Sequence, residues 1–95
     1  MIYLGVGSNL GDRRKNIEIT KFEITQKGVN IINCSNFYES FSWPNVNYPK
    51  FLNIVLRVDT NLTPLKLIKI CKDIEKSLGR KESTSCLLYT SDAAD

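Results

Sequence analysis

The fold is decided at the start of the chain, where residues 2–12 read IYLGVGSNLGD. Residues 2–6 are a short apolar run of strand formers, and the Gly-Ser-Asn turn at residues 7–9 ends it. The side chain of Asp12 can then cap a helix, which the sequence predicts over residues 13–26. A strand that passes through a tight turn into a helix is typical of the start of a layered α+β domain.

The rest of the chain continues this alternation of strands and helices. A strand is predicted over residues 29–34, with an irregular continuation through residues 36–42. Two prolines and two asparagines indicate a loop at residues 43–49, and residues 51–58 have the composition of a third strand. Residues 63–79 predict a helix that begins at a Thr-Pro pair and ends at a glycine, with apolar residues at spacings of three and four.

This order predicts an α+β fold, a ferredoxin-like βαββα sandwich that lacks its final strand and its C-terminal part. We expect the missing strand to belong inside the sheet. The candidate core residues of the first helix and the second strand are Ile17, Phe22, Ile24, Ile31, Ile32 and Cys34.

The composition fits one small globular domain. Of the 95 residues, 42% are hydrophobic and 24% are charged, which excludes a fibrous repeat or a long disordered tail as the main structure. The net charge of +3 comes from residues spread along the chain, so no nucleic-acid footprint is indicated. No apolar run approaches the roughly 20 residues of a membrane span, and no export signal precedes the first strand. We therefore expect a cytoplasmic protein that binds neither a membrane nor nucleic acid.

The cysteines do not indicate a metal site. Cys34, Cys71 and Cys86 form no CxxC pair, and the chain has no histidine, so a zinc site lacks its usual ligands. An odd number of cysteines without an export signal favours reduced thiols that pack as small apolar groups.

The last ten residues differ in character from the rest. Residues 86–95 read CLLYTSDAAD, which is identical to the translation of a transposase-end adapter used in sequencing libraries. We therefore expect residues 1–85 to be the N-terminal part of a domain and residues 86–95 to be a disordered tail. The alternative is a genuine strand from Cys86 to Thr90 with a polar, acidic end.

The turn after the first strand belongs to neither of two common phosphate-binding motifs. No Gly-Lys-Ser/Thr follows it, and its third glycine is misplaced for a dinucleotide fingerprint. Taken with later segments, however, it resembles the hydroxymethyl-dihydropterin pyrophosphokinase family over about residues 2–82. The segments that carry the resemblance are YLGVGSNLGD (3–12), SNFYES (35–40), YPKFLN (48–53), LTP (62–64) and IEKSLGR (74–80).

The resemblance implies a pterin site in the first half of the chain. Phe51 matches an aromatic residue that stacks on the flat pterin ring, and Asn53 matches an amide that meets both donors and acceptors on the pterin edge. Ser40 stands where the family often has a threonine that contacts the ring. The loop that follows departs from the family pattern, but Phe41 and the main chain at Trp43 are also expected to meet the pterin. Two residues of the first turn, Ser8 and Asn9, are expected to support this site, and Asn9 could bond into the same network as Asn53.

The resemblance also implies the transfer of diphosphate from ATP to 6-hydroxymethyl-7,8-dihydropterin, with release of AMP. Lys72 and Glu75 align with helix positions that face ATP, and Arg80 is expected to act in catalysis by holding phosphate oxygens in a charged fork. Two Mg²⁺ ions serve the family, but their ligands are expected beyond the end of this chain, and nothing in residues 1–85 replaces them. The 95-residue chain is therefore expected to be inactive, and the longer enzyme to be a monomer that can be fused to other folate enzymes.

Taken without the resemblance, the same residues allow blander interpretations. Phe51 would be a core aromatic, Asn53 a turn residue, and Lys72 and Glu75 part of a solvated helix face. A non-catalytic ferredoxin-like module that binds a small ligand or RNA is the main alternative, although RNA binding would require more aromatic residues on the central strands. An unstable piece without function is a third interpretation.

Overall fold

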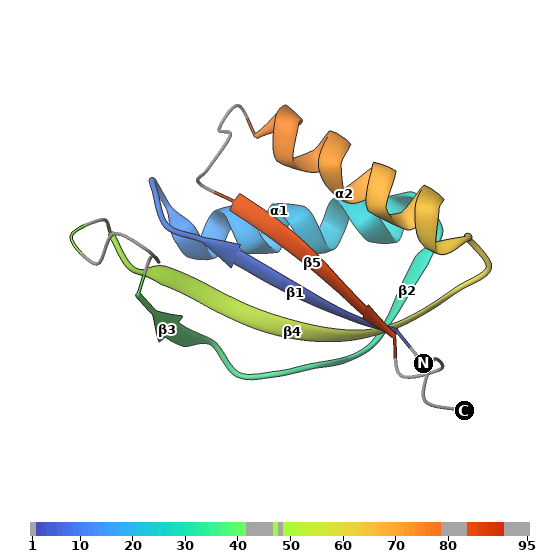
Figure 1. Cartoon of the computed structure of the whole chain (residues 1–95), viewed down its shortest axis with the longest axis horizontal. Helices are drawn as coiled ribbons and strands as arrows, with labels where there is room; N and C mark the ends of the chain where they lie inside the picture. The colour runs from blue at the N-terminus through green and yellow to red at the C-terminus, as the bar shows by residue number, and fades with distance from the viewer. Residues whose placement is uncertain (1, 42–46, 48, 79–83, 91–95) are drawn as a thin grey trace.

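A computed structural model of the chain describes residues 2–41, 47 and 49–78 and the backbone of residues 84–90. Two helices and five strands alternate along the chain (Figure 1). The strands are β1 (Ile2–Ser8), β2 (Val29–Cys34), β3 (Tyr38–Ser40), β4 (Phe51–Thr60) and β5 (Thr84–Thr90), and the helices are α1 (Arg13–Gln26) and α2 (Pro64–Ser77).

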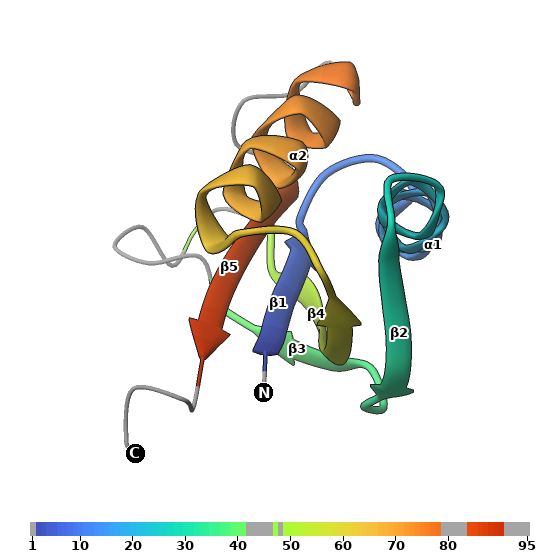
Figure 2. The same cartoon turned by 90° about the vertical axis from the view of Figure 1, so that its right-hand side faces the viewer.

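The strands form one antiparallel sheet in the order β2-β4-β1-β5. β3 pairs with the first residues of β4 and so continues the edge that β2 occupies further along. Ser35 joins the two stretches, because its amide donates to the carbonyl of Val55 and its hydroxyl accepts from the amide of Val55. Both helices lie on the same face of this sheet (Figure 2). The opposite face is open in the described part of the chain.

This arrangement confirms the predicted α+β, ferredoxin-like class. The final strand was expected to be missing and to belong inside the sheet. The structure instead has a strand after α2, β5, which pairs with β1 at the edge of the described sheet. The expectation of a disordered tail is therefore wrong for residues 86–90, and residues 91–95 lie outside the described residues. Strand pairing uses backbone atoms, which any sequence of strand formers can offer to the edge of β1. The adapter origin of residues 86–95 thus stays a prediction.

The hydrophobic core lies between the sheet and the two helices. Leu4 and Val6 of β1 and Leu56 of β4 are almost fully buried there, because alternate residues of each strand point toward the helices. The other buried apolar residues are Ile17, Ile24, Val29, Ile54, Val58, Leu67, Cys71 and Ile74.

Three candidate core residues are exposed. Phe22 is 60% exposed, because it is five positions from Ile17 and so lies on another side of α1. The buried side of the helix, which carries Ile17, has Thr20 instead. Ile32 and Cys34 are exposed because the register of β2 shifts between residues 31 and 33, which turns the end of the strand outward.

Both helix starts are confirmed. The carboxylate of Asp12 accepts from the Lys15 amide at 3.1 Å, and the hydroxyl of Thr63 accepts from the Lys66 amide at 3.2 Å, so each residue caps its helix. Within the described part of the chain, neither helix has the length and apolar character needed to cross a membrane.

Candidate functional site

Three of the five residues expected to bind the pterin meet on the open face of the sheet. Phe51 and Asn53 alternate in β4 with core residues, so their side chains point away from the helices. Ser40 of β3 pairs with Phe51, and Gly7 of β1 pairs with Asn53. β3 and β4 thus bring Ser40, Phe51 and Asn53 together, with Gly7 of β1 beside them, and we call these four residues the open-face group.

The amide of Asn53 is fixed by its neighbours in β3. Its Nδ2 atom lies 2.9 Å from the Ser40 hydroxyl oxygen and 3.2 Å from the Tyr38 carbonyl oxygen, and donates to both. Because a carbonyl oxygen can only accept, Nδ2 has to face Tyr38, which leaves Oδ1 on the side of β1. The orientation of this amide is therefore set by the strand beside it.

Gly7 leaves the space into which two side chains of β4 lean. A Cβ atom at this position would lie 2.7 Å from Oδ1 of Asn53 and 3.2 Å from Cδ1 of Phe51. Both distances are shorter than the 3.4 Å at which ordinary carbon contacts begin. Glycine is therefore required here by close approach, since any side chain would push the amide or the ring away.

The two residues expected to support the site lie behind it and beside it. Ser8 is fully buried on the helical face, where its hydroxyl accepts from Nδ2 of Asn16 in α1 at 3.0 Å. Asn9 is also buried, and its Nδ2 donates a long hydrogen bond of 3.5 Å to the carbonyl of Pro49, just before β4. These contacts tie the turn after β1 to α1 and to the start of β4. A supporting role toward the pterin stays a prediction.

The remaining predicted pterin contacts follow β3. Phe41 is 63% exposed, and the Lys50 ammonium lies 5.0 Å from the centre of its ring. Trp43 lies outside the described residues.

Two of the three residues expected to bind ATP lie on the other side of the sheet. Lys72 and Glu75 form an ion pair of 3.8 Å on α2, in which the Glu75 side chain is only 14% exposed. Because α2 covers the helical face, the structure does not bring this pair to the open-face group. Arg80 lies outside the described residues.

Arg13 is a contact residue that the sequence analysis missed. Its Nη1 atom donates to a carboxylate oxygen of Glu39 in β3 at 2.8 Å and to the carbonyl of Lys50 at 3.0 Å. One signal could have drawn attention to it. The first turn of α1 holds three cations and no acidic residue, although the N-terminus of a helix favours negative charge.

With this geometry established, the comparisons with known proteins decide the family. The model of the family described as 7,8-dihydro-6-hydroxymethylpterin-pyrophosphokinase (HPPK) matches residues 3–90. The chain belongs to the HPPK family. The resemblance inferred from the sequence is thereby confirmed, and the match includes five residues that had been assigned to the tail.

Individual relatives agree with the family match. A 2-amino-4-hydroxy-6-hydroxymethyldihydropteridine pyrophosphokinase of Aquifex aeolicus is 42% identical over 81 residues, which cover 85% of this chain and 50% of the relative. A protein of the same name from Porphyromonas gingivalis is 30% identical over 89 residues, covering 94% and 60%. A folate synthesis bifunctional protein of Pisum sativum, named as mitochondrial, is 33% identical over 81 residues, covering 85% and 16%. The HPPK chain described here thus spans about half the length of the bacterial relatives.

The described residues of this HPPK chain do not fit a magnesium site. No three Asp, Glu, Cys or His side chains come together among the residues that the structure describes. Two of the aspartates already have other partners, because Asp12 caps α1 and Asp73 pairs with Lys69 at 3.6 Å. Mg²⁺ needs several oxygen ligands in tight octahedral geometry, which these separated carboxylates cannot supply together.

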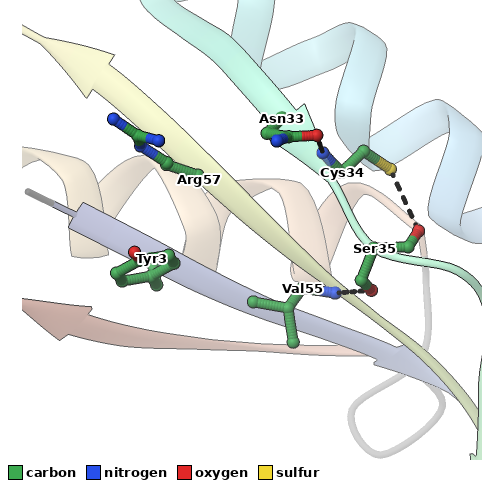
Figure 3. A pocket seen from close by; sticks show the side chains of 6 residues that line it. All are labelled: Tyr3, Asn33, Cys34, Ser35, Val55 and Arg57. Carbon is green, nitrogen blue, oxygen red and sulfur yellow. Dashed lines mark hydrogen bonds between the residues drawn. The ribbon is translucent and has the colours of Figure 1, made fainter.

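A second feature of the open face lies further along β4. Residues of three strands surround a shallow hollow of about 320 Å³ (Figure 3). It is lined by Tyr3, Asn33, Cys34, Ser35, Val55 and Arg57. Every second residue of β4 points to the open face, and these residues are Phe51, Asn53, Val55 and Arg57. The hollow and the open-face group therefore share one side of the sheet.

Proposed function

We propose that this chain is the pterin-binding part of an enzyme that transfers diphosphate from ATP to 6-hydroxymethyl-7,8-dihydropterin and releases AMP. Membership of the HPPK family and the names of the bacterial relatives support this reaction. The observation that carries the proposal is the open-face group, in which the Phe51 ring and the oriented Asn53 amide of β4 meet the Ser40 hydroxyl of β3.

The open-face group suits a flat heterocycle with a polar edge. The ring of Phe51 offers a face on which a pterin can stack in offset geometry. The amide of Asn53 and the hydroxyl of Ser40 offer hydrogen-bonding groups beside that ring, and their mutual hydrogen bond fixes them before a ligand arrives. Phe41 and the main chain at Trp43 are proposed to complete the contacts from the following loop.

In the proposed reaction, the hydroxymethyl oxygen of the pterin forms a bond to the β-phosphorus of ATP. The bond between that phosphorus and the oxygen bridging to the α-phosphate breaks, AMP leaves with the electron pair, and the hydroxyl proton passes to solvent. Such a transfer depends mainly on positioning and on neutralising phosphate charge. Lys72, Glu75 and Arg80 are proposed to act on the ATP side, and Arg80 in catalysis. The two Mg²⁺ ions implied by the resemblance have no fitting ligands among the described residues, so we derive no step through them.

The wider setting of the enzyme is also proposed. A cytoplasmic, monomeric protein remains a prediction from the sequence. Fusion to another folate enzyme is compatible with the bifunctional name of the Pisum sativum relative. We further propose that residues 1–85 are the N-terminal part of the pyrophosphokinase domain and that the longer enzyme supplies the rest of it.

The RNA-binding alternative is less well supported by the open face. Base stacking would require rings at neighbouring positions of the two central strands, β1 and β4. Tyr3 pairs with Arg57, but the next position along the face pairs Gly5 with Val55, neither of which offers a ring. The aromatic residues Tyr3 and Phe51 are thus separated along the sheet, which favours a compact ligand at the Phe51 end.

The proposed function is tested by restoring the missing half. A chimera can join residues 1–85 of this chain to the second half of the Aquifex aeolicus relative. We expect it to release AMP from ATP only when 6-hydroxymethyl-7,8-dihydropterin is present. The Asn53→Ala chimera should show a raised KM for the pterin and an unchanged KM for ATP, whereas the matched Asn30→Ala chimera, changed at an exposed position of β2, should behave as the parent. Equal pterin KM values in all three would refute the assignment of the site.

A further inference from the structure

The contacts of Arg13 join three separate parts of the chain. From the first turn of α1, its guanidinium holds the carboxylate of Glu39 at 2.8 Å and the carbonyl of Lys50 at 3.0 Å. Glu39 directly precedes Ser40, and Lys50 directly precedes Phe51. Since Ser40 and Phe51 are paired across β3 and β4, one side chain holds both strands at the position where the open-face group is built.

β3 is a strand that needs such support. It has only three residues, all of them exposed, and among the described strands it pairs with β4 alone. Short edge strands with solvent-exposed backbone hydrogen bonds open more readily than the centre of a sheet. The position of Ser40 beside Asn53 therefore depends on contacts beyond the backbone ladder.

β3 is held from both of its faces. On the open face, the Asn53 amide donates to the Tyr38 carbonyl and to the Ser40 hydroxyl. Glu39 alternates with these two residues, so its side chain points to the helical face, where Arg13 reaches it from α1. Arg13 and Asn53 thus hold β3 from opposite faces, in addition to its backbone pairing with β4.

The position of Arg13 in its helix does not explain its presence. Three consecutive cations, Arg13, Arg14 and Lys15, stand where the helix dipole disfavours positive charge. Arg14 lies 4.5 Å from the ring centre of Phe37, just before β3, so two of the three cations have partners in the same neighbouring segment. Both hydrogen bonds of Arg13 come from Nη1, whose two N–H groups can donate to two oxygens at once.

We propose that Arg13 is a positioning residue that holds β3 against β4 from the helical face and so keeps Ser40 in place beside Asn53. Its effect on substrate is indirect, since it acts through Glu39 and Lys50. The part of the proposal that concerns the pterin rests on the proposed function, whereas the hold on β3 does not.

The experiment compares three forms of the 95-residue chain: the parent, Arg13→Gln and Lys15→Gln. Lys15→Gln is the matched control, because it removes one positive charge from the same helical turn. Amide hydrogen exchange of residues 38–40 reports the opening of β3, and exchange at Leu56 in the core reports global unfolding. We expect Arg13→Gln to speed exchange in β3 by about threefold to tenfold, because it removes one exposed ion pair and one charged hydrogen bond. The exchange rate at Leu56 should stay unchanged, and Lys15→Gln should exchange as the parent does.

Two further measurements separate positioning from general stability. Titration with 6-hydroxymethylpterin, followed by its own fluorescence, should show a dissociation constant raised roughly threefold in Arg13→Gln and unchanged in Lys15→Gln. The exchanged pair, Arg13→Glu with Glu39→Arg, restores the ion pair and should recover part of both effects, as a double-mutant cycle requires for residues in contact.

The outcomes are distinct. Unchanged exchange in β3 of Arg13→Gln overturns the proposal, and so does faster exchange with an unaltered pterin affinity. Failure of the parent chain to bind pterin, together with faster exchange in Arg13→Gln, refutes the proposed function and leaves the hold on β3 established.

Discussion

Replacing Gly7 with alanine would place a methyl group in space that two side chains of the proposed pterin site use. The new Cβ would lie 2.7 Å from Oδ1 of Asn53, where an ordinary contact begins at 3.4 Å. It would also lie 3.2 Å from Cδ1 of Phe51, so the methyl group would crowd the ring as well as the amide. The amide therefore has to move off β1.

The cost of this movement follows from the hydrogen bonds that hold the amide. Nδ2 of Asn53 donates to the Ser40 hydroxyl at 2.9 Å and to the Tyr38 carbonyl at 3.2 Å. Each such bond contributes about 1 kcal/mol net, so disturbing one or both costs about 1–2 kcal/mol of site organisation. If the pterin requires the amide in its present orientation, binding should weaken by about fivefold to thirtyfold.

The assay is a fluorescence titration of the chain with 6-hydroxymethylpterin, with urea denaturation of the same samples. Gly28→Ala is the control, because its φ of 95° makes alanine strained while nothing lies within 4 Å of the new Cβ. That variant should lose about 1 kcal/mol of stability and keep its pterin affinity. Gly7→Ala with parental pterin affinity and a folded chain would refute the claim that pterin binding needs the space that Gly7 leaves for the Asn53 amide.

Three other experiments test the fold and the reaction. Thr63→Ala removes the cap of α2 and should lower the free energy of unfolding by about 1 kcal/mol in urea denaturation, with no change in pterin affinity; equal stability would contradict the cap. Leu56→Ala, at a fully buried position, should cost about 2–5 kcal/mol, whereas Leu65→Ala, at a position 79% exposed, should cost little; similar losses would contradict the described core. The 95-residue chain should release no AMP from ATP and 6-hydroxymethyl-7,8-dihydropterin, and measurable turnover would show that the metal ligands are not missing.

Local signals were sufficient to predict the helices. Asp12 and Thr63 each carry a side-chain oxygen just before an apolar pattern, and both act as caps in the structure. Burial within α1 was harder to predict. Phe22 is the larger apolar residue, but helical geometry places Thr20 on the face of Ile17, and Thr20 can be buried because its hydroxyl donates to the Asn16 carbonyl.

The end of the sheet could not be predicted from local signals. The register shift near Ile32 depends on how β2 meets β4, which no pattern within β2 specifies. The same holds for β5, since its place beside β1 depends on an unpaired edge elsewhere in the sheet.

The open-face group was partly accessible from the sequence. The family resemblance identified Ser40, Phe51 and Asn53, and the structure brings these three together. It gave no reason for Gly7 beyond a tight turn, because the close approach of Asn53 appears only when β1 and β4 are paired. Arg13 was missed for a similar reason, since its partners lie 26 and 37 positions away along the chain.

The most direct test of the account is the affinity of the 95-residue chain for 6-hydroxymethylpterin before and after the Asn53→Ala change, with Asn30→Ala as the control. The account predicts saturable binding by the parent and the control, and an affinity at least about tenfold lower for Asn53→Ala in a chain that melts at a similar temperature. Equal affinities for all three chains, or no binding by a folded parent chain, would contradict the claim that this part of the HPPK family carries the pterin site on its open face.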